Sequence, residues 1–168
     1  PDAPSADELV FVIIGNGDRR HGGANVRVGR VMPETQYQVI DIARQYDFAA
    51  DMPDDRTNLL AMANAVAGFR FIHMDYEDVD INDPANIVWK EGNTTYVFVP
   101  TEDLPLLEPL RRLGLEGLAD KLNAPLKEIV ERAYHRDYLP VQAADPPEQP
   151  ELTNSTELAA VSPGPPAA

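Results

Sequence analysis

The sequence predicts an α/β fold with one sheet and flanking helices, and three observations support this prediction. Residues 9–14 form a continuous apolar, β-branched run, which is typical of a strand buried on both faces of a parallel sheet. A strand-like alternation over residues 38–43 precedes an amphipathic pattern over residues 54–67, which predicts a helix. Two further β-rich segments, residues 86–90 and 94–99, flank a three-residue Glu-Gly-Asn loop and predict a β-hairpin.

Composition narrows the functional classes. The 168 residues include 28 acidic and 14 basic side chains, which gives a formal net charge of -14. Such a chain repels nucleic acid and anionic membranes, so we expect no nucleic-acid partner. No apolar run approaches the roughly 20 residues that cross a bilayer, so we expect no transmembrane segment. The chain has no cysteine, and its fold therefore owes nothing to disulfides.

The chain is expected to form one domain with two tails. Residues 1–8 are polar and contain proline, and we interpret them as an N-terminal arm. Residues 9–138 carry the predicted strands and helices and make up the domain. Residues 139–168 are rich in proline and alanine with little to bury, which is typical of a tail.

Two loops suggest ligand sites but fail the corresponding templates. Glycines at positions 15, 17, 22 and 23 resemble a phosphate-binding loop, but position 20 is arginine and no Gly-Lys-Ser/Thr occurs. We interpret this loop as a turn that carries Arg19, Arg20 and His21 into solvent. The acidic loop over residues 75–83 fails the EF-hand pattern, because aspartate stands at the glycine position and tryptophan at the glutamate position. We therefore expect no cofactor and no metal.

A candidate acid–base pair stands at the two ends of the central region. The strand over residues 38–43 leads into a corner with Asp47 and Asp51, and the segment after the helix ends on His73. A carboxylate that holds an imidazole in one tautomer lets the histidine take a proton from a hydroxyl nucleophile. The nucleophile itself is missing, because serines occur only at positions 5, 155 and 162, with no G-x-S-x-G elbow and no cysteine.

The helix between the acid and the histidine is expected to begin and end at particular residues. Asp54 or Asp55 can cap its first turn, and Gly68 offers a left-handed stop. Residues 69–72 are then expected to run as an extended segment that leads to His73. After the hairpin we expect further helices, two of them over residues 115–122 and 124–134. Their shared apolar face should pack as core and carries Leu118, Leu122, Leu126, Ile129 and Val130.

Three motifs together resemble a known family. They are His73-Met74-Asp75-Tyr76, the run GNTTYVFVPTEDLPLL over residues 92–107, and Arg44-Gln45-Tyr46-Asp47. These motifs resemble the C-terminal half of the PE-PPE domain. The resemblance runs from about residue 9 to residue 136. That family comprises mycobacterial and related actinobacterial α/β serine hydrolases, similar to cutinases and lipases, which cleave or transfer acyl groups of fatty esters and cell-envelope lipids. The nucleophile-bearing N-terminal half of that domain has no counterpart in the sequence.

The resemblance implies a partial α/β-hydrolase-like sheet and assigns roles to the candidate residues. It makes Asp47 the acid of the triad and His73 the base, with Asp51 as the alternative acid. Asp47 is preferred because it directly follows the strand, where α/β-hydrolases present the acid. Asp51 precedes Met52-Pro53 and is equally suited to capping the next helix.

Two functions from different classes are consistent with these residues. In the first, the chain is the acid and base half of a serine esterase or acyltransferase for acyl esters or envelope lipids, inactive without a serine-bearing segment. In the second, it is a hydrolase-derived interaction or assembly protein, without a nucleophile, of an actinobacterial cell envelope or a phage particle. Under either function, we expect the protein to be extracellular, in the cell envelope or in a virion.

The first strand also predicts a partner. Residues 9–14 are too apolar for an exposed edge strand, and the chain offers too few strands to cover both of its edges. We therefore expect another protein segment, or another copy of the chain, to cover this strand.

Overall fold

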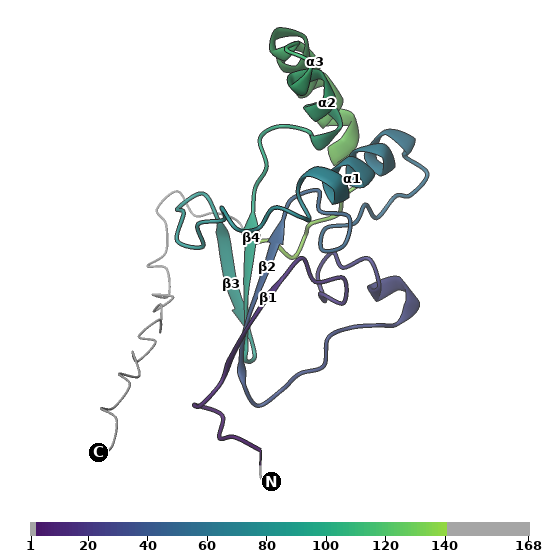
Figure 1. The fold of residues 1–168 in the computed structure, drawn as a ribbon. Coiled ribbons are helices and arrows are strands. Elements are labelled where there is room, and N and C mark those ends of the chain that lie inside the picture. The colour runs from purple at the N-terminus through teal and green to yellow at the C-terminus, as the bar shows by residue number, and fades with distance from the viewer. Residues whose placement is uncertain (1–2, 141–168) are drawn as a thin grey trace, which may run out of the picture.

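The computed structural model describes residues 3–140 as a four-stranded sheet with helices gathered at one end (Figure 1). The sheet order is β1-β2-β4-β3, with β1, β2 and β4 parallel and β3 antiparallel to β4. The expected partial α/β sheet with a hairpin is confirmed. The tail predicted over residues 139–168 lies, past residue 140, outside the described residues. The strands are β1 (Val10–Ile14), β2 (Gln38–Arg44), β3 (Ile87–Glu91) and β4 (Thr94–Val99).

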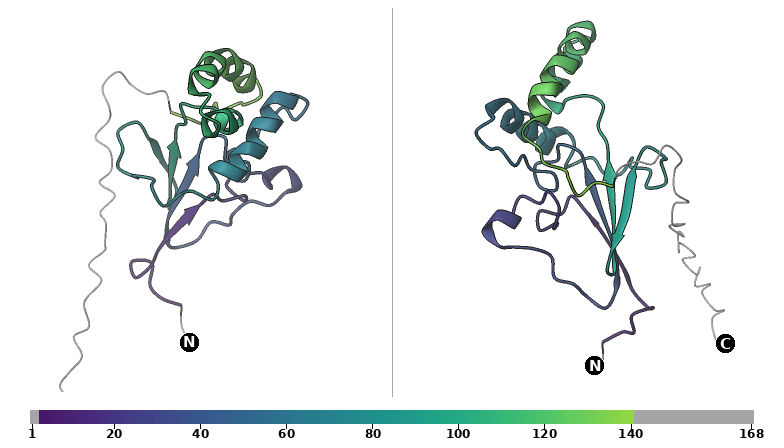
Figure 2. Two further views of the ribbon diagram at one scale, coloured as in Figure 1. Left: turned by 45° about the horizontal axis from the view of Figure 1, so that its top comes forward. Right: turned by 180° about the vertical axis from the view of Figure 1, so that it is seen from behind.

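Helices α1, α2 and α3 lie at the end of the sheet where the parallel strands finish, and all three ribbon views agree on this (Figure 1, Figure 2). The main apolar core lies among these helices and includes Tyr46, Ile72, Leu104 and Val130. Sites in α/β folds form at the carboxyl ends of the strands, so here the helical layer borders the expected site. The helical elements are η1 (Val26–Val28), α1 (Leu59–Phe71), η2 (Pro105–Leu107), α2 (Glu108–Arg112) and α3 (Glu116–Glu131).

The hairpin between β3 and β4 turns in two residues, one fewer than predicted. Glu91 pairs with Thr94, so only Gly92 and Asn93 form the loop. Gly92 has a φ of 56°, which a glycine adopts without steric cost. The strand pairing therefore reaches further toward the turn than the sequence indicated.

α1 begins later than predicted. Asn58 caps it, and the Asn58 side chain accepts a hydrogen bond from the Ala61 N–H at 3.1 Å. Asp54 and Asp55 instead donate their backbone N–H groups to the carbonyl oxygen of Ala133, at 2.8 and 3.0 Å. These bonds tie the segment before α1 to the end of α3.

Gly68 lies inside α1 and does not end it, which corrects the predicted left-handed stop. A Cβ at this position would come 2.0 Å from the Tyr46 carbonyl oxygen. The missing side chain therefore lets α1 pack directly against the corner after β2. Residues 69–71 complete the last turn of the helix and do not run extended.

α3 is one continuous helix where two segments were predicted. Pro125 lies inside it, where a proline removes one intrahelical hydrogen bond and crowds the preceding turn, yet the helix continues through this position. The Asn123 side chain, expected to separate the segments, accepts the Leu104 N–H at 2.9 Å and so anchors the loop before η2. Leu118 and Ile129 are 47% and 41% exposed, so the prediction that they belong to the core is wrong. Among the described elements, none covers that face of α3.

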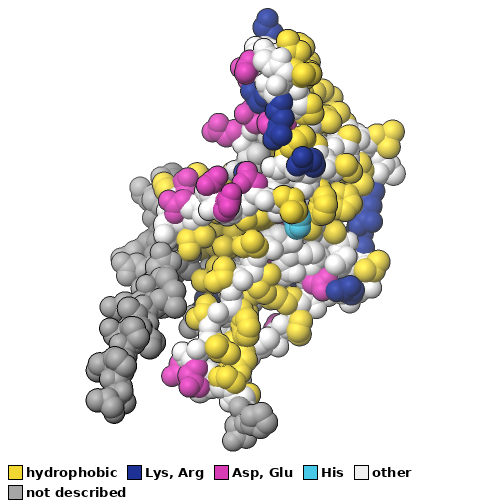
Figure 3. Space-filling model, in the orientation of Figure 1, with side chains coloured by type: hydrophobic (Ala, Val, Ile, Leu, Met, Phe, Trp, Pro, Cys, Tyr) yellow, Lys and Arg dark blue, Asp and Glu magenta, His cyan; other side chains and the backbone are white. Residues whose placement is uncertain are grey.

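β1 is an exposed edge strand, which corrects the prediction of burial on both faces. Val10, Val12 and Ile14 are 53%, 62% and 55% exposed, although β2 pairs with one edge of the strand. Gly15 continues that pairing by donating its N–H to the Ile42 carbonyl oxygen at 3.1 Å. The N–H and C=O groups of the even-numbered residues of β1 therefore point to the open edge. Hydrophobic side chains gather over the sheet on the face seen in Figure 3.

Within residues 3–140, no helix is long and apolar enough to cross a bilayer.

Candidate active site

Asp47 and His73 meet at the helical end of the sheet. Asp47 stands just after β2, and His73 stands just after α1. The imidazole Nδ1 of His73 lies 2.9 Å from Oδ1 and 3.0 Å from Oδ2 of Asp47. The carboxylate is buried, while the His73 side chain is 24% exposed. The structure thus brings the preferred acid and the candidate base into hydrogen-bonding contact.

The corner that presents Asp47 contains an unusual backbone conformation. Tyr46 has a φ of 69° and, within the described residues, is the only residue other than glycine with a positive φ. This conformation costs energy for a bulky side chain, and it persists only where the surroundings fix it. Here the buried Tyr46 hydroxyl donates to the carboxylate of Glu131 on α3, and its carbonyl packs against Gly68. Packing from two helices therefore holds the turn that positions Asp47.

Two neutral donors hold the Asp47 carboxylate besides His73. The Tyr76 hydroxyl donates to Oδ2 at 2.7 Å, and the Ala49 N–H donates to Oδ1 at 2.9 Å. Burial, followed by the charge and the hydrogen bond of Asp47, raises the pKa of Tyr76 above its usual value, so the phenol stays protonated and donates. Because an ionised carboxylate only accepts, Nδ1 of His73 carries a proton and donates as well.

The other side of the imidazole is left open. The Phe69 ring stacks on the imidazole with centroids 4.7 Å apart, and Gly15 at the end of β1 approaches it closely. Nε2 of His73 makes no hydrogen bond to any residue between 3 and 140. Because Nδ1 donates a hydrogen bond to Asp47, Nε2 keeps a free lone pair. It can therefore accept a proton from a group that lies beyond residues 3–140.

Asp51, the alternative acid, has a different partner. Its Oδ2 lies 2.6 Å from a terminal nitrogen of Arg136, and its Oδ1 lies 3.0 Å from Nε of the same guanidinium. It also accepts the Tyr46 N–H at 2.8 Å. Asp51 therefore joins the corner to the segment after α3 and does not reach His73. The catalytic roles themselves stay predictions.

Comparison with known proteins identifies the family. The model of the PE-PPE domain matches residues 1–135. The chain belongs to the PE-PPE domain family. This confirms the resemblance drawn from the three motifs, and it agrees with an α/β-hydrolase-like sheet that presents an acid after a strand.

Relatives of this PE-PPE chain include named enzymes of Mycobacterium tuberculosis. Esterase PE16 is 34% identical over 151 residues, which cover 80% of the chain and 29% of that protein. Diacyltrehalose acyltransferase Chp2 is 31% identical over 162 residues, covering 82% of the chain and 45% of that protein. The uncharacterized PPE family protein PPE42 is 35% identical over 150 residues. The chain thus spans less than half the length of each enzyme. No solved structure matches it.

The loop after β1 of the PE-PPE chain is packed against the sheet, which corrects the predicted solvent-exposed turn. Arg19 is 1% exposed, and its guanidinium lies 2.7 Å from the carboxylate of Asp41 in β2. Nε2 of His21 lies 3.0 Å from the carboxylate of Glu91. Arg20 alone behaves as predicted and remains exposed. The buried Asp41 requires a cation, because an unpaired buried charge is strongly destabilising.

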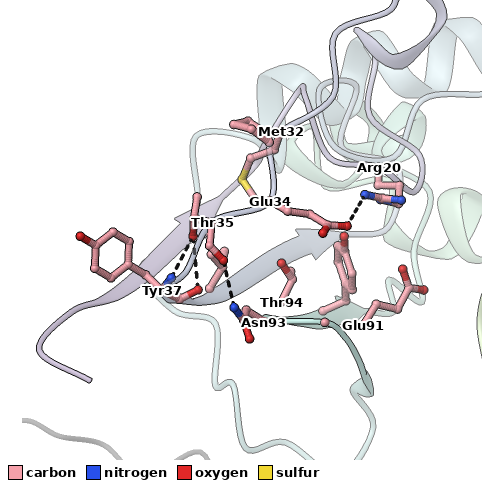
Figure 4. A pocket seen from close by; sticks show the side chains of 12 residues that line it. Arg20, Met32, Glu34, Thr35, Tyr37, Glu91, Asn93 and Thr94 are labelled. Atoms are coloured by element: carbon pink, nitrogen blue, oxygen red, sulfur yellow. Dashed lines mark hydrogen bonds and ion pairs between the residues drawn. The ribbon is translucent and has the colours of Figure 1, made fainter. Parts of the chain in front are cut away.

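A pocket of about 330 Å³ lies at the opposite end of the sheet, beside the start of β2 and the hairpin turn (Figure 4). Its charged groups are already paired, Arg20 with Glu34 at 3.1 Å and Glu91 with His21 at 3.0 Å. Neither Asp47 nor His73 lines it, so it plays no part in the acid–base pair. The described residues contain no group of three acidic or histidine side chains that could hold a metal ion.

Sequence reasoning missed two residues of the site, Tyr76 and Gly15. Tyr76 lies three positions after His73, within a motif that carried the family resemblance, and this spacing was the available signal. Gly15 has a φ of 58°, and a Cβ there would lie 2.8 Å from Cε1 of His73. Its contact joins residues far apart in the chain and has no local signature.

Proposed function

We propose that the chain supplies the acid and the base of a serine esterase or acyltransferase for acyl esters or envelope lipids. A second segment, which is not part of these 168 residues, supplies the serine. The observation that carries this proposal is the state of His73, whose Nδ1 is bound by Asp47 while Nε2 has no partner within residues 3–140. The relatives named as an esterase and as a diacyltrehalose acyltransferase support the same chemistry.

The proposed reaction proceeds through an acyl-enzyme. Nε2 of His73 takes the proton of the serine hydroxyl while the serine oxygen attacks the carbonyl carbon of the acyl ester. Asp47 stabilises the resulting imidazolium through Nδ1. The imidazolium then gives its proton to the leaving alcohol as the ester bond breaks. Water completes hydrolysis, or a second alcohol completes acyl transfer, and His73 removes the proton of either one.

We place the serine-bearing segment beside β1. The open edge of β1 offers unpaired backbone groups, and its half-exposed side chains would each gain about 1 kcal/mol on full burial, roughly half the value for a fully exposed side chain. Gly15, at the carboxyl end of β1, touches the His73 ring. A parallel strand added at this edge would end next to the imidazole, where a nucleophile after that strand meets Nε2.

The chain alone should be inactive. We expect no turnover of p-nitrophenyl acyl esters and no labelling by a fluorophosphonate probe. Ser5 bonds to Glu8, and Ser155 and Ser162 stand in the Pro- and Ala-rich stretch of the sequence, where no nucleophile elbow occurs. Labelling of the isolated chain at any serine would contradict the proposed division of the site.

A graft tests the function directly. The chain would replace the matching region of esterase PE16, and the chimera would be assayed with a p-nitrophenyl acyl ester. We expect turnover that His73→Ala lowers by about a thousandfold or more, since loss of the base removes general base catalysis. A matched control is His135→Ala, which leaves the pair intact and should keep the rate. A folded chimera without turnover would sink the enzymatic proposal and favour the interaction protein.

The uncovered β1 edge makes a separate prediction about association. Sedimentation at micromolar concentration should show self-association of the isolated chain, or a hydrophobic dye should bind to it. Replacing Val10 and Val12 with threonine keeps the strand β-branched and should weaken both effects. A stable monomer that binds no dye would overturn the proposed covering of β1.

A further inference from the structure

A small pocket lies between three segments of the chain: the glycine turn after β1, the stretch before α1 and the residues after α3. Its volume is about 210 Å³. The Met52 N–H donates to the Gly22 carbonyl oxygen at 2.8 Å, which ties the first two segments together. The His135 N–H donates to the Asp54 carboxylate at 2.7 Å, which ties the second to the third. The pocket is therefore formed before any ligand arrives.

The lining of this pocket is basic in a chain whose net charge is -14. Three arginines line it, against one acidic residue, Asp54, and two histidines that count as neutral in the net charge complete the polar lining. Arg27 donates to the Asp54 carbonyl oxygen, and Arg56 lies 3.5 Å from the Ala24 carbonyl oxygen. Within residues 3–140, neither guanidinium pairs with a carboxylate. The third, Arg20, pairs with Glu34 outside the lining.

We propose that this pocket binds a phosphate group, carried by a small phosphate ester or by a lipid headgroup. A guanidinium has five N–H donors, and each of these two arginines directs one hydrogen bond to the protein backbone. The remaining donors suit the several acceptor oxygens of a phosphate, which arginine binds in a bidentate manner. The volume is below the roughly 300–1,000 Å³ of pockets for drug-sized molecules, so a small anionic group fits better.

The larger pocket at the hairpin end does not compete for this role. Its one arginine, Arg20, is paired with Glu34, and Glu91 adds a negative charge to its wall. A phosphate there would meet two carboxylates. The phosphate site is also separate from the Asp47–His73 pair, since neither residue lines it. The proposal stands without the proposed esterase function.

Binding is tested by NMR titration of the chain with sodium phosphate against sodium chloride at matched ionic strength. We expect a saturable shift of the Gly22 and Gly23 amide resonances with phosphate only. The double variant Arg27→Gln/Arg56→Gln should bind at least about tenfold more weakly, because each lost charge-assisted hydrogen bond is a strong one. Arg132→Gln is the matched control, because Arg132 pairs with Glu128 on the surface of α3. It should bind as the unaltered chain does.

A second variant and a second probe make the test decisive. Arg56→Gln alone removes only a long contact to a carbonyl, so it should fold normally and still weaken binding several-fold. Vesicles of phosphatidic acid, compared with phosphatidylcholine vesicles, test the headgroup source, and inorganic phosphate tests the free source. Arginine-dependent binding in either arm supports the proposal. The proposal would be overturned if neither phosphate nor the vesicles bound saturably, or if the double variant bound as strongly as the unaltered chain.

Discussion

Asp47 and Asp51 stand on the same corner of the chain and are both buried, yet their surroundings are opposite. Asp51 faces the guanidinium of Arg136, which carries its charge at every ordinary pH. Asp47 faces a phenol, a backbone N–H and an imidazole, of which only the imidazole can become positively charged. Burial alone therefore does not distinguish the two aspartates, but the charge of the partner does.

The comparison shows that one corner of the chain can hold both a structural ion pair and a candidate catalytic acid. A carboxylate paired with a permanent cation has its charge compensated in the resting fold, and it acts as a structural tie. A carboxylate held by neutral donors keeps its negative charge uncompensated until a proton arrives on the neighbouring imidazole. The hydrogen bond between Nδ1 and Asp47 thus fixes the orientation of the His73 ring, as the proposed acyl transfer requires. Four predictions test this contrast, from the largest expected effect to the smallest.

Asp51→Asn should cost the most stability. The change leaves Arg136 buried with only the Glu131 carboxylate, 2.7 Å away, as its partner. Breaking a buried pair from one side typically costs about 3–5 kcal/mol, and urea denaturation would measure the loss. Asp120→Asn is the control, because it removes an exposed partner of Arg111 and should cost under about 1 kcal/mol. Equal losses in the two variants would remove the structural role of Asp51.

Asp47→Asn should lower the stability less than Asp51→Asn does, but it should change the tautomer of the His73 ring. The amide keeps one acceptor oxygen for Tyr76 or Ala49, so we expect a loss of about 1–2 kcal/mol. Its NH₂ group can donate to Nδ1 of His73, which moves the ring proton to Nε2. Nitrogen-15 NMR of the histidine ring would show this change of tautomer. An unchanged tautomer would mean that Asp47 does not hold the imidazole.

Tyr76→Phe should have a moderate effect. It removes the hydroxyl that donates to Asp47 and accepts the Arg44 N–H at 3.0 Å, for a loss of about 1 kcal/mol. In the esterase chimera we expect kcat to fall with KM little changed, because Tyr76 holds Asp47 and is not itself one of the proposed reacting groups. Tyr37→Phe removes a surface hydroxyl that bonds to Pro4, and it should change neither quantity.

The smallest effect is the change with pH in the stability that Tyr76 contributes to the fold. The pKa of Tyr76 is raised in the fold, first by burial and then by Asp47, so the unfolded chain loses this proton first. Its contribution is complete below the ordinary tyrosine pKa near 10 and declines as pH rises above it. The stability gap of about 1 kcal/mol between the unaltered chain and Tyr76→Phe should therefore narrow as the pH rises above that point, and it should close within roughly one pH unit. A constant gap between pH 9 and 11 would contradict this.

Local patterns predicted the elements that local residues determine. Alternation over residues 38–43 marked β2, and the two β-rich segments around Gly92 marked the hairpin. The contact between Asp47 and His73 was predicted because each residue stands at the end of an element and lies in a motif of the family, which pairs an acid with a histidine. Each of these inferences used a local pattern or a family motif.

The errors arose where distant contacts override local patterns. Gly68 looks like a helix stop, but the Tyr46 carbonyl on another segment requires a glycine inside the helix. Arg19 looks like a loop arginine, but the buried Asp41 draws it into the fold. Neither contact leaves a trace in the spacing of nearby residues. Tyr76 differs from these two, because its place three residues after His73 in a family motif was a signal, although its partner Asp47 precedes α1 in the chain.

The contact between Gly15 and His73 has a practical consequence for experiments on this chain. Gly15 is the residue directly after β1, and its Cα carries no atom between the strand and the imidazole. A small tilt of β1 is therefore transmitted to the histidine ring without any intervening side chain to absorb it. The ring resonances of His73 should then act as a spectroscopic gauge of strand position. They would register an added strand at the far edge of β1 before any substrate is present.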